Sequence, residues 1–316
     1  MGKYLPNMGD RLMKALMFTG QGSQVVGMAS SLYNEVPQVR ELFEQANSIL
    51  GFNLTSIMFD GPDETLKETR YTQPALFLHE AAIVTTLRDK LIPDVVAGHS
   101  LGEFSAYYAA GVLSFEDALS IVALRGSLMF EAGTKQKGGM LAVLGLENSI
   151  VESICSDLIL QGKVVVPANY NSPGQIVVSG NDADVDDSME LFKTAGASMV
   201  KKLVVSGAFH SPLMEYAKEA LAEKIHSTTF SAPKCPVYPN VTASKTTNVD
   251  ELKTLCIQQL TSPVRWAQTL EQMHQDGVDT YIEIGPGKVL QGLVKRTLKG
   301  VNFTGIDTFA DCTNYN

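Results

Sequence analysis

One short stretch, residues 94–106, constrains the fold of this chain more than any other. The apolar run Val95–Ala97 leads into Gly98-His99-Ser100-Leu101-Gly102, and a segment of helix-forming residues follows. This pattern predicts a strand, a sharp turn with Ser100 at its apex, and a helix. Glycines on both sides of the turn remove Cβ atoms that would collide there. The serine hydroxyl then lies beside a helix N-terminus, where backbone N–H groups stabilise negative charge, so Ser100 is a candidate nucleophile.

The chain on both sides of this turn alternates between strand-like and helix-like segments. A short apolar strand is expected at Ala15–Thr19, and a long buried helix at Gln73–Leu91, beginning near Pro74. After residue 208, helices alternate with strands expected at 237–241, 281–284 and 301–306. This alternation predicts an α/β protein with a largely parallel sheet and helices on both of its faces.

In the middle of the chain, the order of the expected strands and helices is different. Residues 138–207 read as strand, helix, strand, strand, helix, strand, which is the ferredoxin-like pattern, with residues 169–174 joining the two central strands. We therefore predict a discontinuous α/β core at 14–137 and 208–310, and an inserted subdomain at 138–207. Residues 1–13 are expected to form an irregular N-terminal extension.

Charge and cysteine content exclude several classes of function. The net charge of −9 argues against a nucleic-acid partner. The four cysteines are far apart and form no Cys/His cluster, so neither a metal site nor a disulfide framework is expected, and a cytoplasmic location is favoured. No apolar run reaches the roughly 18 residues that span a bilayer, so no membrane partner is expected.

A serine nucleophile needs a base, and the chain has five histidines. His99 is adjacent to Ser100 and should point away from it. His79, His226 and His274 lie in expected helices and have a structural role as their simplest interpretation. His210 lies in a turn between a strand and a helix, where catalytic groups often occur. The residue pattern leaves both roles open for His210, and no Asp or Glu stands out as a third member.

Two further features have both a structural and a functional interpretation. Arg125 lies among apolar residues of an expected helix, where it either pairs with an internal acid or receives a substrate carboxylate. Gly20-Gln21-Gly22 follows the first strand, but Val25 occupies the third glycine position of a dinucleotide fingerprint. This loop is either a plain turn or a means of bringing backbone N–H groups and Gln21 to a ligand.

Six motifs, taken together in their order along the chain, resemble the malonyl-CoA:acyl carrier protein transacylases of fatty-acid synthesis. The resemblance covers nearly the whole chain and is far more specific than any one motif. The motifs are Gly20-Gln21-Gly22-Ser23-Gln24, Gly98-His99-Ser100-Leu101-Gly102-Glu103, Arg125-Gly126, Asn169-Tyr170-Asn171-Ser172-Pro173-Gly174-Gln175, Gly207-Ala208-Phe209-His210 and Glu283-Ile284-Gly285-Pro286-Gly287.

The resemblance implies a fold and an activity. The fold is an α/β-hydrolase-like core with a mostly parallel sheet and an inserted ferredoxin-like α+β subdomain. The activity is transfer of a malonyl group from malonyl-CoA to the phosphopantetheine thiol of acyl carrier protein through malonyl-Ser100. His210 would be the base, Gln21 and the backbone N–H of Leu101 the oxyanion hole, and Arg125 the group that binds the malonyl carboxylate.

The resemblance also assigns residues around this centre. Gln259 would orient His210 through its backbone carbonyl, and Asn169, Asn171 and Gln175 would line the cleft. Phe209 resembles the pattern of malonyl-selective members. Thr19 stands where the family usually has proline, which predicts a less rigid loop after it.

No bound cofactor is implied, and the expected partners are coenzyme A thioesters and acyl carrier protein. A monomer is expected. Because acyl carrier proteins are acidic, a local basic patch should bind them despite the acidic net charge. The candidates for this patch are Lys201, Lys202, Lys288, Lys295 and Arg296. A polyketide-pathway malonyltransferase, a serine thioesterase or esterase, and a non-catalytic carrier-binding protein are the alternatives.

Overall fold

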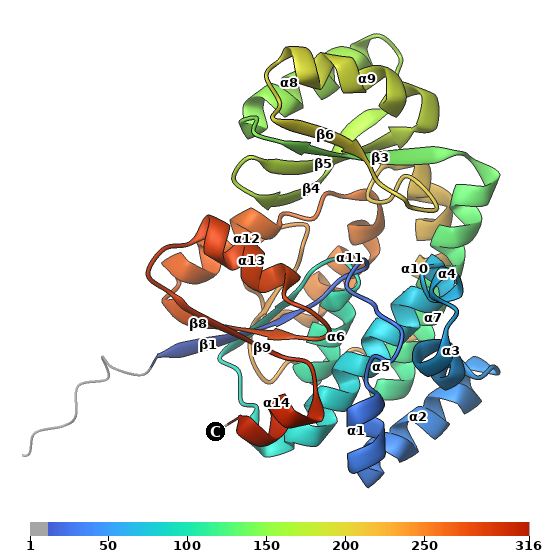
Figure 1. The fold of residues 1–316 in the computed structure, drawn as a ribbon, viewed down its shortest axis with the longest axis vertical. Coiled ribbons are helices and arrows are strands. Elements are labelled where there is room, and N and C mark those ends of the chain that lie inside the picture. Colours follow the sequence, from blue (N-terminus) through green and yellow to red (C-terminus); the bar gives the residue numbers. More distant parts are fainter. Residues whose placement is uncertain (1–11, 316) are drawn as a thin grey trace, which may run out of the picture.

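The protein contains two β-sheets, described here for residues 12–315 in a computed structural model (Figure 1). The larger sheet has five strands in the order β7-β2-β1-β8-β9, and all its neighbouring strands are parallel. This confirms the predicted parallel sheet. Its strands are β1 (Met13–Phe18), β2 (Val95–Gly98), β7 (Val237–Tyr238), β8 (Val278–Ile284) and β9 (Asn302–Ile306).

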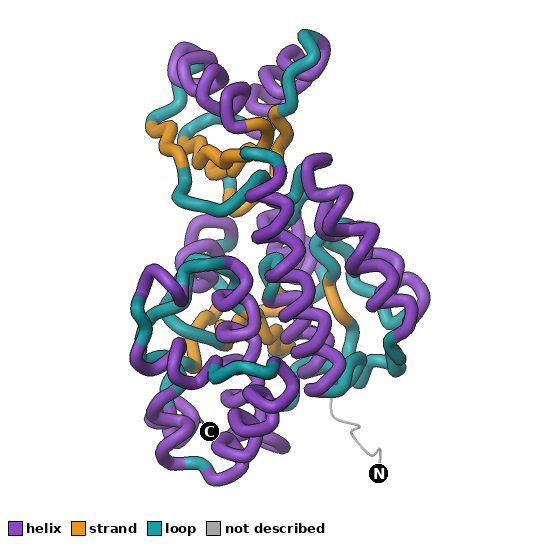
Figure 2. The backbone as a smooth tube through the Cα atoms, turned by 90° about the vertical axis from the view of Figure 1, so that its right-hand side faces the viewer, coloured by secondary structure: helices purple, strands orange, loops and turns teal. Residues whose placement is uncertain are grey.

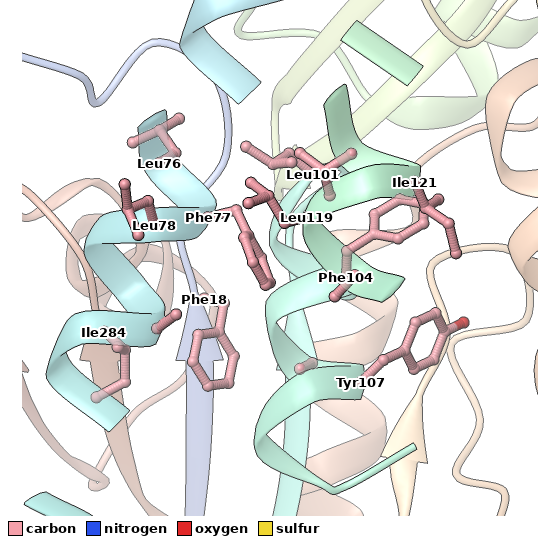
Figure 3. Packing of buried hydrophobic residues seen from close by; sticks show 14 of the residues in the cluster. Phe18, Leu76, Phe77, Leu78, Leu101, Phe104, Tyr107, Leu119, Ile121 and Ile284 are labelled. Atoms are coloured by element: carbon pink, nitrogen blue, oxygen red, sulfur yellow. The ribbon is translucent and has the colours of Figure 1, made fainter. Parts of the chain in front are cut away.

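Helices cover both faces of this sheet because successive side chains of a strand point to opposite sides. Leu16 and Phe18 of β1 pack into a core with α5 (Thr69–Leu87) and α6 (Gly102–Ala109), and Figure 3 shows Phe18 close to Phe77 of α5. Ala15 and Met17 pack on the other face, against α12 (Trp266–Gln275) and α13 (Val289–Thr297). The helices before the second sheet are α1 (Ser30–Glu35), α2 (Pro37–Leu50), α3 (Leu54–Asp60), α4 (Asp63–Leu66), α5 (Thr69–Leu87), η1 (Arg88–Lys90), α6 (Gly102–Ala109) and α7 (Phe115–Lys135). Those after it are η2 (Pro212–Met214), α10 (Glu215–Ser227), α11 (Val249–Gln258), η3 (Gln259–Thr261), α12 (Trp266–Gln275), α13 (Val289–Thr297) and α14 (Phe309–Asn314).

The second sheet forms a ferredoxin-like subdomain at one end of the molecule (Figure 2). Its elements are β3 (Gly138–Leu144), α8 (Asn148–Leu160), β4 (Val165–Ser172), β5 (Gln175–Asn181), α9 (Asp182–Thr194) and β6 (Met199–Lys202). The four strands pair antiparallel in the order β4-β5-β3-β6, so the predicted βαββαβ pattern is confirmed. Leu141 and Val143 pack under α8 and α9, whereas Met140 and Val177 join the core of the larger part. The subdomain therefore contributes one sheet face to the boundary between the two parts.

Several boundaries differ from the sequence prediction; β7, for example, ends at Tyr238 and not at residue 241. The long helix α5 begins at Thr69, so Pro74 lies inside it and not in its first turn; buried Thr72 and Gln73 extend the helix toward its N-terminus. Asn169 and Asn171 belong to β4 and not to a connecting loop, because two irregularities in the β4–β5 register accommodate polar residues there. Residues 1–11 of the expected extension lie outside the described part, while Met13 already begins β1.

Candidate active site

Ser100 lies on the predicted turn between β2 and α6. Its φ of 53° is a left-handed conformation that is strained for a residue with a side chain. The flanking glycines make this turn sterically feasible. A Cβ on Gly98 would lie 1.9 Å from the carbonyl carbon of Gly102, and one on Gly102 would lie 2.2 Å from the carbonyl oxygen of Phe18. The turn is thus pressed against the carboxyl end of β1.

Asn240, which the sequence analysis missed, holds this turn in place. Its Oδ1 accepts a hydrogen bond from the backbone N–H of Ser100, and its Nδ2 donates to the carbonyl of Gly98, both at 2.7 Å. Its own backbone N–H donates to Glu103 Oε2 at 2.7 Å. Asn240 is fully buried, and it follows the short strand β7, which pairs with β2. Its position beside β2 could not be read from local periodicity.

His210 meets Ser100 from the loop before η2. Its Nε2 lies 2.7 Å from Ser100 Oγ, and its Nδ1 lies 3.0 Å from the carbonyl oxygen of Gln259. A carbonyl only accepts, so Nδ1 carries the proton and Nε2 is left to accept from the serine hydroxyl. The other four histidines lie elsewhere or face away; His99 Nε2, for example, is 2.8 Å from Asn171 Oδ1.

The surroundings of His210 favour its uncharged form. Burial, and to a smaller extent the nearby positive charge of Arg125, lower the pKa of His210 to about 3. The imidazole is therefore neutral across the physiological range and able to accept a proton.

Arg125, on α7, is completely buried beside this pair. Its Nη2 donates to Ser100 Oγ at 3.1 Å and to Gln259 Oε1 at 3.0 Å, and its Nη1 donates to Gln73 Oε1 at 2.7 Å. Burial lowers the pKa of Arg125 to about 10, so the guanidinium is still charged at neutral pH. Gln73, on α5, is a second residue that the sequence analysis did not identify. Two neutral amides and a hydroxyl thus hold a buried cation that can exchange them for a carboxylate.

An acid also lies behind Arg125. The Glu103 carboxylate attracts the guanidinium and accepts hydrogen bonds from Tyr107 Oη at 2.6 Å and from the Asn240 backbone. Both interpretations that the sequence left open therefore have a structural basis: an internal acid is near, and the guanidinium also reaches Ser100.

Leu101 and Gln21 line the same cavity as Ser100 and His210. Leu101 directly precedes α6, and Gln21 lies in the loop after β1. Within residues 12–315, neither of their backbone N–H groups has a hydrogen-bond acceptor. The side-chain amide of Gln21 is already engaged, because Nε2 donates to Thr69 Oγ1 at 3.1 Å. Any oxyanion contact from Gln21 is therefore expected from its backbone and not from its side chain.

A cavity of about 190 Å³ brings the predicted residues together. It is lined by Gln21, Ser100, Leu101, Arg125, Asn169, Asn171 and His210, with apolar residues that include Met129, Met140, Val177 and Phe209. A second cavity of about 370 Å³ shares Gln21, His99 and Asn171 with it and extends to Gln175, Lys288 and Arg296. Gln259 is not among the lining residues; it contacts His210 and Arg125, and its Nε2 donates to the carbonyl oxygen of Ser100 at 2.9 Å. Arg296 Nη1 donates to Gln175 Oε1 at 2.9 Å, which links α13 to the subdomain.

A strained serine turn after a parallel strand, a neutral buried histidine and two free backbone N–H groups together define a serine-dependent acyl-transfer enzyme of the α/β class. The sequence matches the acyl transferase domain family over residues 16–311. The chain belongs to this family.

Three proteins of high sequence identity show which members of the family this chain is similar to. A malonyl CoA-acyl carrier protein transacylase of Staphylococcus aureus is 44% identical over 302 residues, covering 96% of this chain and 98% of that protein. An acyl carrier protein S-malonyltransferase from Vibrio cholerae has a TM-score of 0.91 at 41% identity, covering 96% of this chain and 99% of the other. A malonyl-transacylase solved in complex with a type II PKS acyl-carrier protein has a TM-score of 0.92 at 37% identity, covering 96% and 98%.

Residues 12–315 contain no helix long and apolar enough to span a bilayer. In the same residues, no three His, Cys, Asp or Glu side chains gather in a way that would hold a metal ion.

Proposed function

We propose that this enzyme transfers a malonyl group from malonyl-CoA to the phosphopantetheine thiol of acyl carrier protein and so supplies the elongation unit of fatty-acid synthesis. The observation that carries the proposal is the position of Arg125. Its buried guanidinium lies 3.1 Å from the Ser100 hydroxyl, in the cavity that also holds His210. A carboxylate bound there would leave a thioester carbonyl, one methylene away, next to the nucleophile.

The first half-reaction acylates Ser100. His210 Nε2 takes the hydroxyl proton while Oγ attacks the thioester carbonyl of malonyl-CoA. The backbone N–H groups of Gln21 and Leu101 stabilise the resulting oxyanion, where the loss of one donor typically costs about 10²–10³ in rate. The C–S bond then breaks, and His210 returns its proton to the departing coenzyme A sulfur. Gln259 keeps the required tautomer by accepting from Nδ1.

The second half-reaction runs the same steps with a different thiol. The pantetheine thiol of the carrier protein gives its proton to His210, and its sulfur attacks malonyl-Ser100. The C–O bond of the ester breaks, and Ser100 Oγ recovers the proton from His210. Asn169, Asn171 and Gln175 line the two cavities and offer amide groups to the pantetheine chain.

The carrier protein should dock beside the second cavity. Lys288 and Arg296 line it, and Lys295 lies next to Arg296 in the last turn of α13. Lys202, in contrast, is paired with Asp182 and Asp186, at 2.8 and 2.6 Å. We therefore favour Lys288, Lys295 and Arg296 over Lys202 as docking residues, and Lys201 stays a candidate. Charge reversal of Lys295, which does not line the cavity, should raise the KM for acyl carrier protein and leave the KM for malonyl-CoA unchanged.

The decisive experiment separates the two half-reactions. Protein mixed with malonyl-CoA and analysed by mass spectrometry should carry the malonyl group on the peptide that contains Ser100. The Ser100→Ala variant should carry none, and added holo-acyl carrier protein should remove the label as malonyl-carrier. A label at another residue, or no label, would refute the mechanism.

A serine thioesterase or esterase is the main alternative, since it uses the same turn and histidine. Water would then hydrolyse the acyl-enzyme and release free malonate, so the product distinguishes a hydrolase from an acyltransferase. Any acyl-enzyme at all would exclude a non-catalytic carrier-binding protein. An acyl carrier protein of a polyketide pathway as acceptor would require the same residues, and a panel of carrier proteins would separate the pathways.

We also propose that the enzyme is a cytoplasmic monomer without a resident cofactor. All four cysteines are free and buried, which suits a reducing compartment. Residues 14–137 with 208–310, and 138–207, are the proposed domain bounds. Sedimentation or light scattering at micromolar concentration tests the monomer.

A further inference from the structure

Thr69 is a buried hydroxyl residue beside the site that takes no part in the two half-reactions. It is the first residue of α5, and its exposed fraction is 0%. Its Oγ1 accepts a hydrogen bond from Gln21 Nε2 at 3.1 Å and lies 2.9 Å from Ser206 Oγ. A hydroxyl group has one proton and two lone pairs, so Thr69 can accept from Gln21 and still share a hydrogen bond with Ser206.

The first of these partners lies in loop 20–24, which follows β1. Two hydrogen bonds lie inside this loop: Ser23 Oγ donates to the carbonyl oxygen of Gly20, and the N–H of Gly22 donates to Gln24 Oε1, both at 2.8 Å. Within residues 12–315, the bond from Gln21 to Thr69 is the only hydrogen bond that joins loop 20–24 to another part of the chain. The internal bonds therefore set the shape of the loop, and Thr69 sets its position.

The second partner lies in the segment that leads to the base. Ser206 follows β6 and precedes His210 by four residues, and its neighbour Val205 lines the cavity of the site. Ser206 is packed closely on α7, since a Cβ on Gly133 would lie 1.6 Å from the Ser206 carbonyl oxygen. The hydroxyl of Thr69 thus lies between loop 20–24 and the segment that carries His210.

The first turn of α5 is itself held in place. A Cβ on Gly126 of α7 would lie 2.9 Å from the carbonyl oxygen of Thr69, so the two helices are in close contact there. Gln73, one turn further along the same face of α5, accepts from Arg125 Nη1 at 2.7 Å. The same turn of helix therefore contacts both loop 20–24 and the buried guanidinium.

We propose that Thr69 is a positioning residue. Its hydroxyl fixes loop 20–24 relative to the segment of His210, so that the backbone N–H of Gln21 and the base are both in place when Ser100 attacks. Displacement of a catalytic group by about 1 Å can cost about a hundredfold in rate. The inference rests on the proposed function for the reaction at Ser100, whereas the contacts of Thr69 do not depend on it.

The test compares the intact wild-type enzyme with two variants at one position. Thr69→Val has nearly the same shape and lacks the hydroxyl, and Thr69→Ser keeps the hydroxyl. Thr69→Val should lower the rate of Ser100 acylation at saturating substrate by about ten- to a hundredfold for malonyl-CoA and acetyl-CoA alike, because both form the same oxyanion. The KM values should not change, since the oxyanion contact forms in the transition state. Thr69→Ser should keep most of the wild-type rate; equal rates in the two variants would refute the proposal.

Thr72→Val is the matched control. It removes another buried hydroxyl from the same turn of α5, and this hydroxyl donates to the carbonyl oxygen of Leu66 at 2.6 Å and not to the site. The control should lower thermal stability about as much as Thr69→Val and leave the acylation rate unchanged. If it slowed acylation as much as Thr69→Val does, weakening of α5 would explain both results and the positioning role would be wrong.

A double-mutant cycle tests whether the contact between Gln21 and Thr69 carries the effect. Gln21→Met removes the side-chain amide and keeps the backbone N–H. The double variant with Thr69→Val should be no slower than either single variant, because all three lack the same hydrogen bond. Losses that multiply would contradict the proposal. Should Thr69→Val fail to fold, a wild-type acylation rate in Gln21→Met would overturn the proposal by itself.

A measurement without substrate separates this proposal from the proposed function. Amide hydrogen exchange of residues 20–24 should be faster in Thr69→Val than in Thr69→Ser, because the loop loses its hydrogen bond to α5. If no protein acylates Ser100, the proposed function fails, and the exchange rates alone decide whether Thr69 holds the loop. Equal exchange in the two variants would show that it does not.

Discussion

Replacement of Arg125 by alanine tests the specificity of the site most directly. The change removes three hydrogen bonds, to Gln73, Ser100 and Gln259, together with the buried charge that would receive the malonyl carboxylate. Loss of one partner of a buried, hydrogen-bonded charge pair costs about 2–5 kcal/mol. Since about 1.4 kcal/mol corresponds to a factor of ten, kcat/KM for malonyl-CoA should fall about 30- to 5,000-fold.

Acetyl-CoA supplies the internal control, because it has the same thioester and lacks the carboxylate. Its kcat/KM should change less than about tenfold in Arg125→Ala. Arg125→Lys should recover little malonyl transfer, because an ammonium cannot form the two-pronged contact. Both substrates are assayed with one carrier protein, after circular dichroism has established that the variants are folded. Equal losses for the two substrates would mean that Arg125 has a structural role. The assignment of malonyl as the transferred group would then be refuted.

Three further predictions concern the elements around Ser100. Because the pKa of His210 lies at about 3, the rate of Ser100 acylation should show no acid limb near the ordinary histidine value of about 6.5; such a limb would refute the neutral, buried base. Asn240→Ala leaves the Ser100 N–H and the Gly98 carbonyl without a partner, which costs about 1–3 kcal/mol each, so thermal stability and kcat should both fall. An unchanged kcat would show that the turn keeps its conformation without Asn240. Gly98→Ala should abolish acylation, since its Cβ would lie 1.9 Å from a backbone carbon, whereas the control Gly292→Ala, on α13, meets nothing within 4 Å and should remain active.

Local sequence patterns were sufficient for much of the fold. The apolar run before Gly98 and the helix-forming residues after Gly102 predicted the turn at Ser100, because strand and helix periodicity are local properties. The order of elements in 138–207 likewise predicted the antiparallel subdomain. Errors occurred where local signals conflicted: Pro74 is common in a first turn but lies inside α5, and polar Asn169 and Asn171 lie in a strand.

The order of the motifs placed Ser100, His210, Arg125 and Gln21 in one site, although the residues alone left the roles of His210 and Arg125 open. Distance along the chain explains why other residues were missed. Asn240 bonds to a residue 140 positions away, and Gln73 to one 52 away. No periodicity or spacing signals such pairs, because each exists only when β7, α5 or α7 packs beside its partner.

The sequence by itself therefore determined the strands, the helices, the serine turn and the residue types that acyl transfer requires. Only the tertiary structure decided which polar groups hold them in place and in which charge state. Burial is the largest cause of the lowered pKa values of His210 and Arg125, and it is a property of the whole packed molecule, since it depends on side chains from distant segments excluding water. At the Ser100 turn, local sequence accounts for the bend, and the two hydrogen bonds of Asn240 account for its fixed position.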